Sequence, residues 1–463
     1  MTEPDAAPPE PAPAPEPAGP AAGLDTAALL RSRQYVSLLV LAALLGIPAS
    51  AVAYLFLKVV GESQNWVFST LPADLGFHTV PTWWPIPPVL VAGVVVSLTV
   101  KYLPGHGGHE PADGFQAGGT PDPKWLPSVF LAAFATLALG IVLGPEAPLV
   151  LIGGGLGVLA VHLAAKDAPP MVATVMAAAG SFAAISTLLG SPLLGAFLLL
   201  EAAGLAGPTV GLVLVPGLLA AGVGSLIMIG LDSWTGWGTM SLALPALPHF
   251  AHPNGVMFLY AIAFGIGAAL LGWPIRVGAR LLRPVVDRNR LVLTPVIGLG
   301  VGLVAIAFAQ ITGKSATQVL FSGQSALGPL IGQAATWTAG AVIVLIICKS
   351  VAYSLSLSSF RGGPIFPAMF LGGAVGVATS HLPGLSLVPG VAMGIGVMAT
   401  IMLGLPLTSV LLATLLLGAD GLTTMPLVIV GVAVAYVAGA RLQPSIDRIT
   451  GPIVPAGAPT PSG

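Results

Sequence analysis

The sequence predicts an all-α, polytopic membrane protein built from two related halves, and three observations support this class. Of the 463 residues, 55% are hydrophobic and only 7% are charged, whereas soluble globular domains carry about 25% charged residues. Long apolar runs follow one another along most of the chain. A Gly-Pro skeleton occurs once in each half, and internal repeats are typical of membrane transporters. The net charge of −1 provides no basic face for nucleic acid.

The apolar runs lie between two polar tails and on either side of a basic stretch. We divide the chain into a disordered Pro/Ala-rich tail (1–30), a first transmembrane half (31–275), a basic linker (276–290), a second transmembrane half (291–450) and a disordered C-terminal tail (451–463). Arginines before the first run and in the linker predict that the N-terminus and the linker are cytoplasmic. We expect a multi-pass protein of the plasma (inner) membrane.

Several of the apolar runs are too short to cross a bilayer. We expect helices at 34–60, 86–103, 125–143, 147–165, 171–189, 192–205, 209–231, 255–283, 291–310, 334–356, 366–380, 388–403, 406–418 and 425–440. A hydrocarbon core about 30 Å thick requires about 20 helical residues. Short, interrupted helices are tolerated at membrane depth only where protein or a water-filled cavity surrounds them.

The repeated skeleton reads G-P-x-x-P-x-x-x-x-G-G-x-x-G. Its first copy contains Gly144, Pro145 and Pro148, and its second contains Gly363, Pro364 and Pro367, at an offset of 219 residues. Two further Gly-Pro breaks recur at nearly the same offset, Gly190-Ser191-Pro192 with Gly404-Leu405-Pro406, and Gly105 and Pro111 with Gly323 and Pro329. The constant order and offset indicate paired helix breaks in two inverted halves.

A helix that begins inside the membrane is suited to bind an anion, because its first N–H groups lack intrahelical partners and its dipole is positive there. Proline in the first turn costs no needed donor. Glu146 lies between the two prolines of the first copy and is surrounded by apolar residues. Its carboxylate could act as a tethered anion, as a gate and as a proton acceptor. The alternative is an ordinary glutamate that caps a helix and faces a loop.

These motifs resemble those of the CLC family of chloride channels and proton-coupled anion antiporters. The run Gly140-Ile-Val-Leu-Gly-Pro-Glu-Ala-Pro148 is similar to the family's G-[KR]-E-G-P signature, and Gly363–Pro367 to its G-x-F-x-P motif. Gly105–Glu110 lies where the family has G-S-G-I-P-E. The resemblance covers residues 30 to 450, without cytoplasmic CBS domains. It implies a homodimer with one anion pathway per subunit, Glu146 as the gate and backbone N–H donors around Ala147, Ile365 and Phe366.

The chain departs from the family pattern at several positions. Pro145 replaces the basic residue before the glutamate, and His106 replaces the serine that contacts the anion. In the second motif, Ile365 replaces the phenylalanine, and Pro364 replaces a residue whose N–H is a donor. Ile446 replaces the pore tyrosine. These departures make the chloride selectivity and the geometry of the anion site open questions. His106 is a candidate anion contact. Glu201 is a candidate internal proton relay, although Ala202 replaces the second glutamate of the family's pair.

Other charged residues have weaker interpretations. His106, His109, Glu110 and Asp113 include metal-ligand types, but no second cluster supports them, so we expect no metal and no cofactor. Lys349 and Arg361 border the second motif and are interpreted as helix-end charges.

The sequence therefore predicts a transporter rather than an enzyme. Its expected partners are a small inorganic anion such as chloride, protons if transport is coupled, and membrane lipid. An alternative that stays open is a channel or uniporter of the same fold for fluoride or another anion. So do an inverted-repeat carrier of an organic solute and a membrane scaffold that does not transport. The retained Glu146 argues against the scaffold.

Overall fold

A computed structural model describes residues 31–164, 168–204, 209–236, 238, 242, 244 and 247–451. The predicted N-terminal tail, and the C-terminal tail after residue 451, lie outside the described residues. Every regular element in the described part is helical, apart from one isolated antiparallel bridge between Gly144 and Gly363. The predicted all-α fold class is confirmed.

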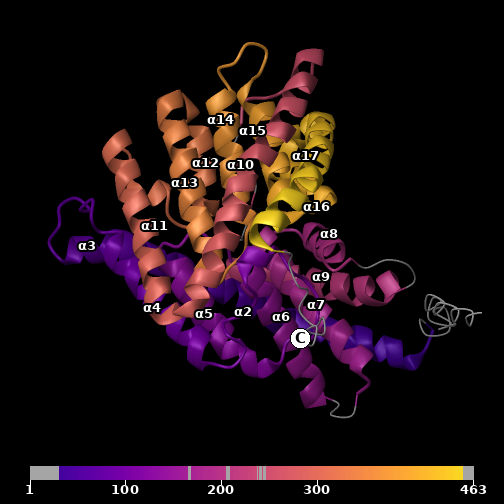
Figure 1. Cartoon of the computed structure of the whole chain (residues 1–463). Helices are drawn as coiled ribbons and strands as arrows, with labels where there is room; N and C mark the ends of the chain where they lie inside the picture. Colours follow the sequence, from indigo (N-terminus) through magenta and orange to yellow (C-terminus); the bar gives the residue numbers. More distant parts are fainter. Residues whose placement is uncertain are drawn as a thin grey trace, which may run out of the picture.

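The first half forms one body of packed helices, drawn from indigo to magenta in Figure 1. Its helices are α2 (Arg33–Asn65), α3 (Leu71–Asp74), α4 (Ile86–Tyr102), α5 (Leu126–Ala138), α6 (Glu146–Ala164), α7 (Pro170–Leu189), α8 (Pro192–Ala202) and α9 (Thr209–Thr235). A π-helical turn (Trp66–Thr70) joins α2 to α3, and short 3₁₀ turns (Pro111–Asp113 and Pro123–Trp125) lie between α4 and α5.

The second half lies against the first and is drawn mainly in orange and yellow (Figure 1). Its helices are α10 (Gly255–Arg288), α11 (Arg290–Thr312), α12 (Gln324–Gly332), α13 (Ala339–Ser359), α14 (Ile365–Thr379), α15 (Leu387–Leu403), α16 (Pro406–Leu416) and α17 (Gly421–Thr450). Three 3₁₀ turns (Ala316–Gln318, Ala334–Thr336 and Gly418–Asp420) complete this half.

Each helix expected from the apolar runs has a counterpart, but some bounds differ, and two helices, α3 and α12, were not expected. The expected helix 125–143 ends at Ala138, because the backbone turns at Gly140 with φ 95° to lead into α6. Helix α12 was not expected, because its Gly and Pro residues interrupt the apolar pattern. The predicted boundary between the first half (31–275) and the linker (276–290) falls inside one helix, α10, which packs on α13, α15 and α17 of the second half. The linker is helical over nearly its whole length, within α10 and the start of α11.

Matching glycines pack matching helices in the two halves. A Cβ on Gly153 of α6 would overlap the backbone carbonyl of Gly180 in α7, and a Cβ on Gly372 of α14 would overlap that of Gly394 in α15. Helices α7 and α15 both end at a glycine with positive φ, Gly190 and Gly404. The two halves therefore share one packing scheme, as their repeated motifs predict.

Eight helices of the described residues are long and apolar enough to cross a membrane. Five others are apolar but shorter, α4, α8, α14, α15 and α16. Three of these short helices, α8, α14 and α16, follow a Gly-Pro break directly. The predicted combination of long spans and broken helices is thus present.

Candidate functional site

The two copies of the Gly-Pro skeleton are in direct contact. Gly144 and Gly363 exchange both backbone hydrogen bonds, with N···O distances of 2.7 and 2.6 Å. Helix α6 begins two residues after Gly144, and α14 begins two residues after Gly363. The contact therefore brings two helix N-termini together, and the free N–H groups of both point into one region.

Glu146 crosses from its own helix to the other one. Its carboxyl group is fully buried, and its Oε1 accepts a hydrogen bond of 2.8 Å from the backbone N–H of Phe366, in the first turn of α14. Its Oε2 has no hydrogen-bond donor in the described part of the chain. A Cβ at Gly144 or at Gly363 would overlap the carboxyl oxygens. Glycine at both positions thus makes room for a carboxylate at the N-terminus of α14.

Two cavities reach the start of α14, to which this carboxyl group is bonded. One, of about 330 Å³, is lined by Pro364, and the other, of about 110 Å³, is lined by Phe366 and Met369. Glu146 lines neither cavity. The short segment from Pro364 to Phe366, with Glu146 bonded to it, therefore contributes to the lining of both cavities.

The other predicted motif residues lie within this arrangement. Ala147 and Ile365 are buried in the first turns of α6 and α14, where backbone N–H groups lack intrahelical partners. Pro148 and Pro367 also lie in these first turns, so their missing N–H groups cost no helical hydrogen bond. Pro145 accepts a hydrogen bond of 3.0 Å through its carbonyl oxygen from Leu149 N–H.

Helix α13 holds both copies of the skeleton through a stripe of polar side chains. Tyr353 Oη donates to the Pro364 carbonyl oxygen at 2.8 Å, and Val142 N–H donates to Ser356 Oγ at 3.1 Å. Tyr353 and Ser356 are three residues apart, so they lie on one face of the helix. Tyr353 is a buried aromatic hydroxyl beside the second copy of the Gly-Pro skeleton. Tyr353 belongs to no repeated motif in the sequence, so its contact with Pro364 could not be predicted.

Lys349 continues the same stripe one turn earlier and corrects a prediction. It was expected to be a helix-end charge, but it lies in the middle of α13 and is fully buried. Its Nζ donates to the carbonyl oxygens of four consecutive residues, 318 to 321, at 3.1 to 3.2 Å, and lies 4.3 Å from the ring centre of Phe370. The ammonium therefore fixes a segment whose Phe321 N–H bonds the Gly140 carbonyl oxygen, just before the first motif.

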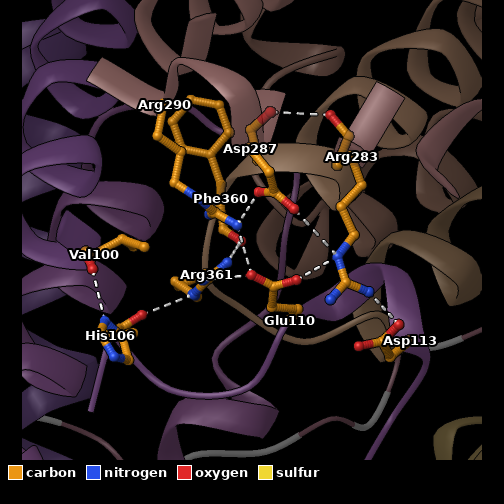
Figure 2. A network of polar contacts seen from close by, with 11 residues as sticks. Val100, His106, Glu110, Asp113, Arg283, Asp287, Arg290, Phe360 and Arg361 are labelled. Atoms are coloured by element: carbon orange, nitrogen blue, oxygen red, sulfur yellow. Dashed lines mark hydrogen bonds and ion pairs between the residues drawn. The ribbon is translucent and has the colours of Figure 1, made fainter. Parts of the chain in front are cut away.

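A network of charged residues lies on the loop side of the second motif (Figure 2). Arg361 Nη2 donates to Glu110 Oε1 at 2.9 Å, and its Nε donates to the carbonyl oxygen of His106 at 3.1 Å. Glu110 also pairs with Arg283 of α10 and with Arg290 of α11. The network thus joins the 105–110 loop, the junction of α10 and α11, and Arg361, which lies two positions before Gly363.

The charges of this network support each other. Burial alone would raise the pKa of the Glu110 carboxyl, but the guanidiniums of Arg361, Arg290 and Arg283 hold that pKa below its usual value. Burial lowers the pKa of Arg361 to about 10, and Glu110 opposes that shift. Burial and the nearby Arg361 also lower the pKa of His109. Glu110 is therefore held ionised and His109 neutral near pH 7.

His106 lies beside this network and not beside Glu146. Its Nδ1 is 2.9 Å from the Val100 carbonyl oxygen, at the end of α4, and its φ is 50°. It lines a third cavity, of about 660 Å³, together with His109 and Arg361. Among the described residues, no group of three His, Cys, Asp or Glu side chains could hold a metal ion. Glu110 and Asp113 instead pair with arginines.

Glu201 binds the N-terminus of a helix in the opposite half. Its Oε1 accepts from Leu407 N–H at 2.9 Å, and its Oε2 accepts from Thr408 N–H at 2.7 Å and from Thr408 Oγ1 at 2.6 Å. These donors belong to the first turn of α16. The end of α8 is thereby joined to the start of α16, its counterpart in the repeat. Ile446, expected at the position of the pore tyrosine, is buried in α17.

The chain is similar to several known proteins. Residues 91–440 match the family model described as "Voltage gated chloride channel". The "Putative ion-transport protein YfeO" of Salmonella paratyphi A is 30% identical over 359 residues, covering 75% of this chain and 81% of the relative, and its counterpart in Salmonella choleraesuis gives the same values.

Two solved structures share the fold. A slow cyanobacterial Cl⁻/H⁺ antiporter superposes with a TM-score of 0.70 at 19% identity, covering 89% of this chain and 98% of its own. A CLC-type fluoride/proton antiporter superposes with a TM-score of 0.64 at 18% identity, covering 87% and 95%.

Proposed function

This chain belongs to the voltage-gated chloride channel (CLC) family, and on this premise we propose that it carries a small inorganic anion, chloride first, through a pore gated by Glu146. One observation carries the proposal. The Glu146 carboxyl group occupies the N-terminus of α14, bonded to Phe366 N–H, beside two cavities. A helix N-terminus binds free anions as readily as tethered ones. The carboxylate therefore competes with a transported anion for the same donors.

The gating step follows from this competition. An ionised Glu146 holds the Phe366 N–H and keeps the two cavities apart. A protonated Glu146 accepts that hydrogen bond less strongly, so an anion can replace it at the first-turn N–H groups of Ala147, Ile365 and Phe366. Neutral backbone donors hold an anion loosely enough for it to leave again. Protons would thus enter transport through the same carboxyl group that gates the anion.

The roles of His106 and Glu201 stay predictions of the family resemblance. His106 lines the third cavity, and neither of the two cavities that reach the Pro364–Phe366 segment. Glu201 accepts three hydrogen bonds from the first turn of α16. A proton relay through Glu201 would have to break these bonds.

We further propose a homodimer in the plasma membrane, with the N-terminus and the α10–α11 junction in the cytoplasm. Leu193 of α8 and Leu407 of α16 are 55% and 49% exposed, and these two helices lie against each other at one end of the structure. Apolar side chains there suit contact with a second copy or with lipid. Mass photometry of the purified protein in lipid nanodiscs tests the dimer, and a single-copy mass contradicts it.

The test of transport is a flux assay on the purified full chain in liposomes. Anion efflux and internal pH are recorded together for chloride and for fluoride, with wild type, Glu146→Gln and Glu62→Gln. Glu62 is an exposed glutamate of α2 and serves as the matched control. We expect anion flux with linked proton movement in wild type and in the control, and loss of the proton movement in Glu146→Gln.

The other outcomes separate the alternatives. Anion flux without proton movement in wild type identifies a channel or uniporter, and preference for fluoride over chloride changes the substrate. Flux that is the same in Glu146→Gln and wild type contradicts the gate. Absence of flux for every inorganic anion tested contradicts the proposed function and leaves the carrier of an organic solute and the scaffold.

A further inference from the structure

We propose that Arg276 forms a binding site for a monovalent inorganic anion in the 330 Å³ cavity, on the route to Glu146. This inference rests on the proposed function and adds a side-chain site to it. The cavity is lined by Arg276 and Arg280 of α10, Gln443 of α17, Thr400 of α15 and Pro364 of the gate motif. It therefore extends from two guanidiniums to the segment that Glu146 closes.

The charge of Arg276 is not neutralised by an ion pair. Its Nη2 donates to the amide oxygen of Gln443 at 2.5 Å, and no carboxylate among the described residues forms an ion pair with it. Asp447 is instead bound by Arg280 Nη1 at 2.9 Å and by Gln443 Nε2 at 2.7 Å, both on the same oxygen. Asp447 thus balances Arg280, and one positive charge is left in the cavity.

The neighbouring arginines do not share this property. Arg283, Arg290 and Arg361 each pair with at least one carboxylate of the network in Figure 2. Asp113, the acidic residue that lines the cavity, pairs with Arg283. The buried Nε of Arg280 has no acceptor among the described residues. Guanidinium donors therefore exceed carboxylate acceptors on this side of the gate.

Arg276 is also connected to the gate through Tyr353. Tyr353 lies within electrostatic reach of both Arg276 and Glu146, and its hydroxyl bonds the Pro364 carbonyl oxygen. An anion held at Arg276 would therefore wait in the cavity that Pro364 closes. The chain has Ile446 and His106 where the family has its pore tyrosine and serine, and Arg276 supplies a positive side chain in this cavity.

The charge balance also selects the class of ligand. One uncompensated positive charge matches a monovalent ion such as chloride, bromide or fluoride. A divalent oxyanion or a dicarboxylate would need a second free cation, which the lining residues do not provide. Fixed charge in a cavity raises the local concentration of the opposite ion. Arg276 should therefore act mainly on the affinity for the anion, and less on the maximal rate.

Two experiments test this site in the full-length protein. In the liposome assay, Arg276→Gln should raise the KM for the anion by about fivefold to tenfold at low ionic strength and change the maximal rate far less, because one nearby charge is removed. Arg276→Lys should restore part of the affinity. Arg441→Gln removes an exposed arginine of α17 and should keep the wild-type KM. A KM unchanged in Arg276→Gln overturns the proposal.

The second experiment does not depend on transport, and its main readout uses the wild-type protein. Crystals of wild-type protein grown in sodium bromide should show an anomalous peak beside the Arg276 guanidinium, and Arg276→Gln crystals should lose it. An empty cavity at a bromide concentration that fills other sites overturns the proposal. A peak in a protein that moves no anion supports the site and contradicts the proposed function.

Discussion

Gly144 and Gly363 form a two-hydrogen-bond bridge that joins the two copies of the Gly-Pro skeleton at the centre of the molecule. The bridge places the N-termini of α6 and α14 in register, so the Glu146 carboxyl group from one half reaches Phe366 N–H of the other. Neither half has a complete site alone. The duplication visible in the sequence therefore also assembles the proposed gate.

The first prediction concerns the space around this carboxyl group. In Gly363→Ala, the new Cβ would overlap Glu146 Oε2, so the carboxyl group must leave Phe366 N–H. We expect Gly363→Ala to change anion flux in the same direction as Glu146→Gln and to weaken proton movement. Gly222→Ala in α9 is the control, because a Cβ there meets nothing within 4 Å. Wild-type coupling in a folded Gly363→Ala protein contradicts the closed gate.

The two helix breaks could be predicted from the sequence because their signals are local. Gly, Pro and an apolar-flanked glutamate repeat at a constant offset, and helix breaks follow from the chemistry of glycine and proline. Contacts between distant segments leave no such signal. Lys349 appears in sequence as a charge near a motif, and its four carbonyl partners become visible only when residues 318–321 fold against α13.

The contacts of Glu201 and Arg361 could not be predicted for the same reason. Glu201 lies 206 positions before Leu407 in the chain, and Arg361 lies 251 positions after Glu110. Neither spacing has a periodicity that single-sequence analysis can detect. Both partners become adjacent because the halves pack together.

The second prediction concerns the buried lysine. Lys349→Met keeps the apolar stem but removes the ammonium, so four buried carbonyl oxygens lose their shared donor. We expect a loss of about 3 kcal/mol of unfolding free energy or more, since hydrogen bonds to charged groups are worth about 1.5–3 kcal/mol each. Thermal unfolding in detergent measures it. Lys101→Met, at an exposed lysine, should stay within about 0.5 kcal/mol of wild type. Equal losses in both variants contradict the role of Lys349.

The third prediction separates the two roles of Glu201. Glu201→Gln removes the negative charge at the N-terminus of α16 and one of its two acceptor oxygens. We therefore expect a loss of about 1 kcal/mol of unfolding free energy and a lower melting temperature. We expect the proton-to-anion ratio in liposomes to stay at the wild-type value. A lost proton movement together with an unchanged melting temperature would instead support the relay.

The fourth prediction concerns the stability of the protein at acid pH. The arginines hold the pKa of the Glu110 carboxyl in the folded protein below its usual value of about 4.3. Between these two pKa values the unfolded chain binds more protons than the folded protein, so stability decreases there as the pH falls. The stabilisation by this carboxylate is thus complete above the usual pKa and is lost as pH falls toward the folded pKa. We expect Glu110→Gln to melt earlier than wild type at pH 7, and the difference to shrink as the pH falls below ~4. Thermal unfolding between neutral and acid pH measures this, with Glu62→Gln as the exposed control. A difference that grows with acid would mean that Glu110 is not the ionised centre of the network.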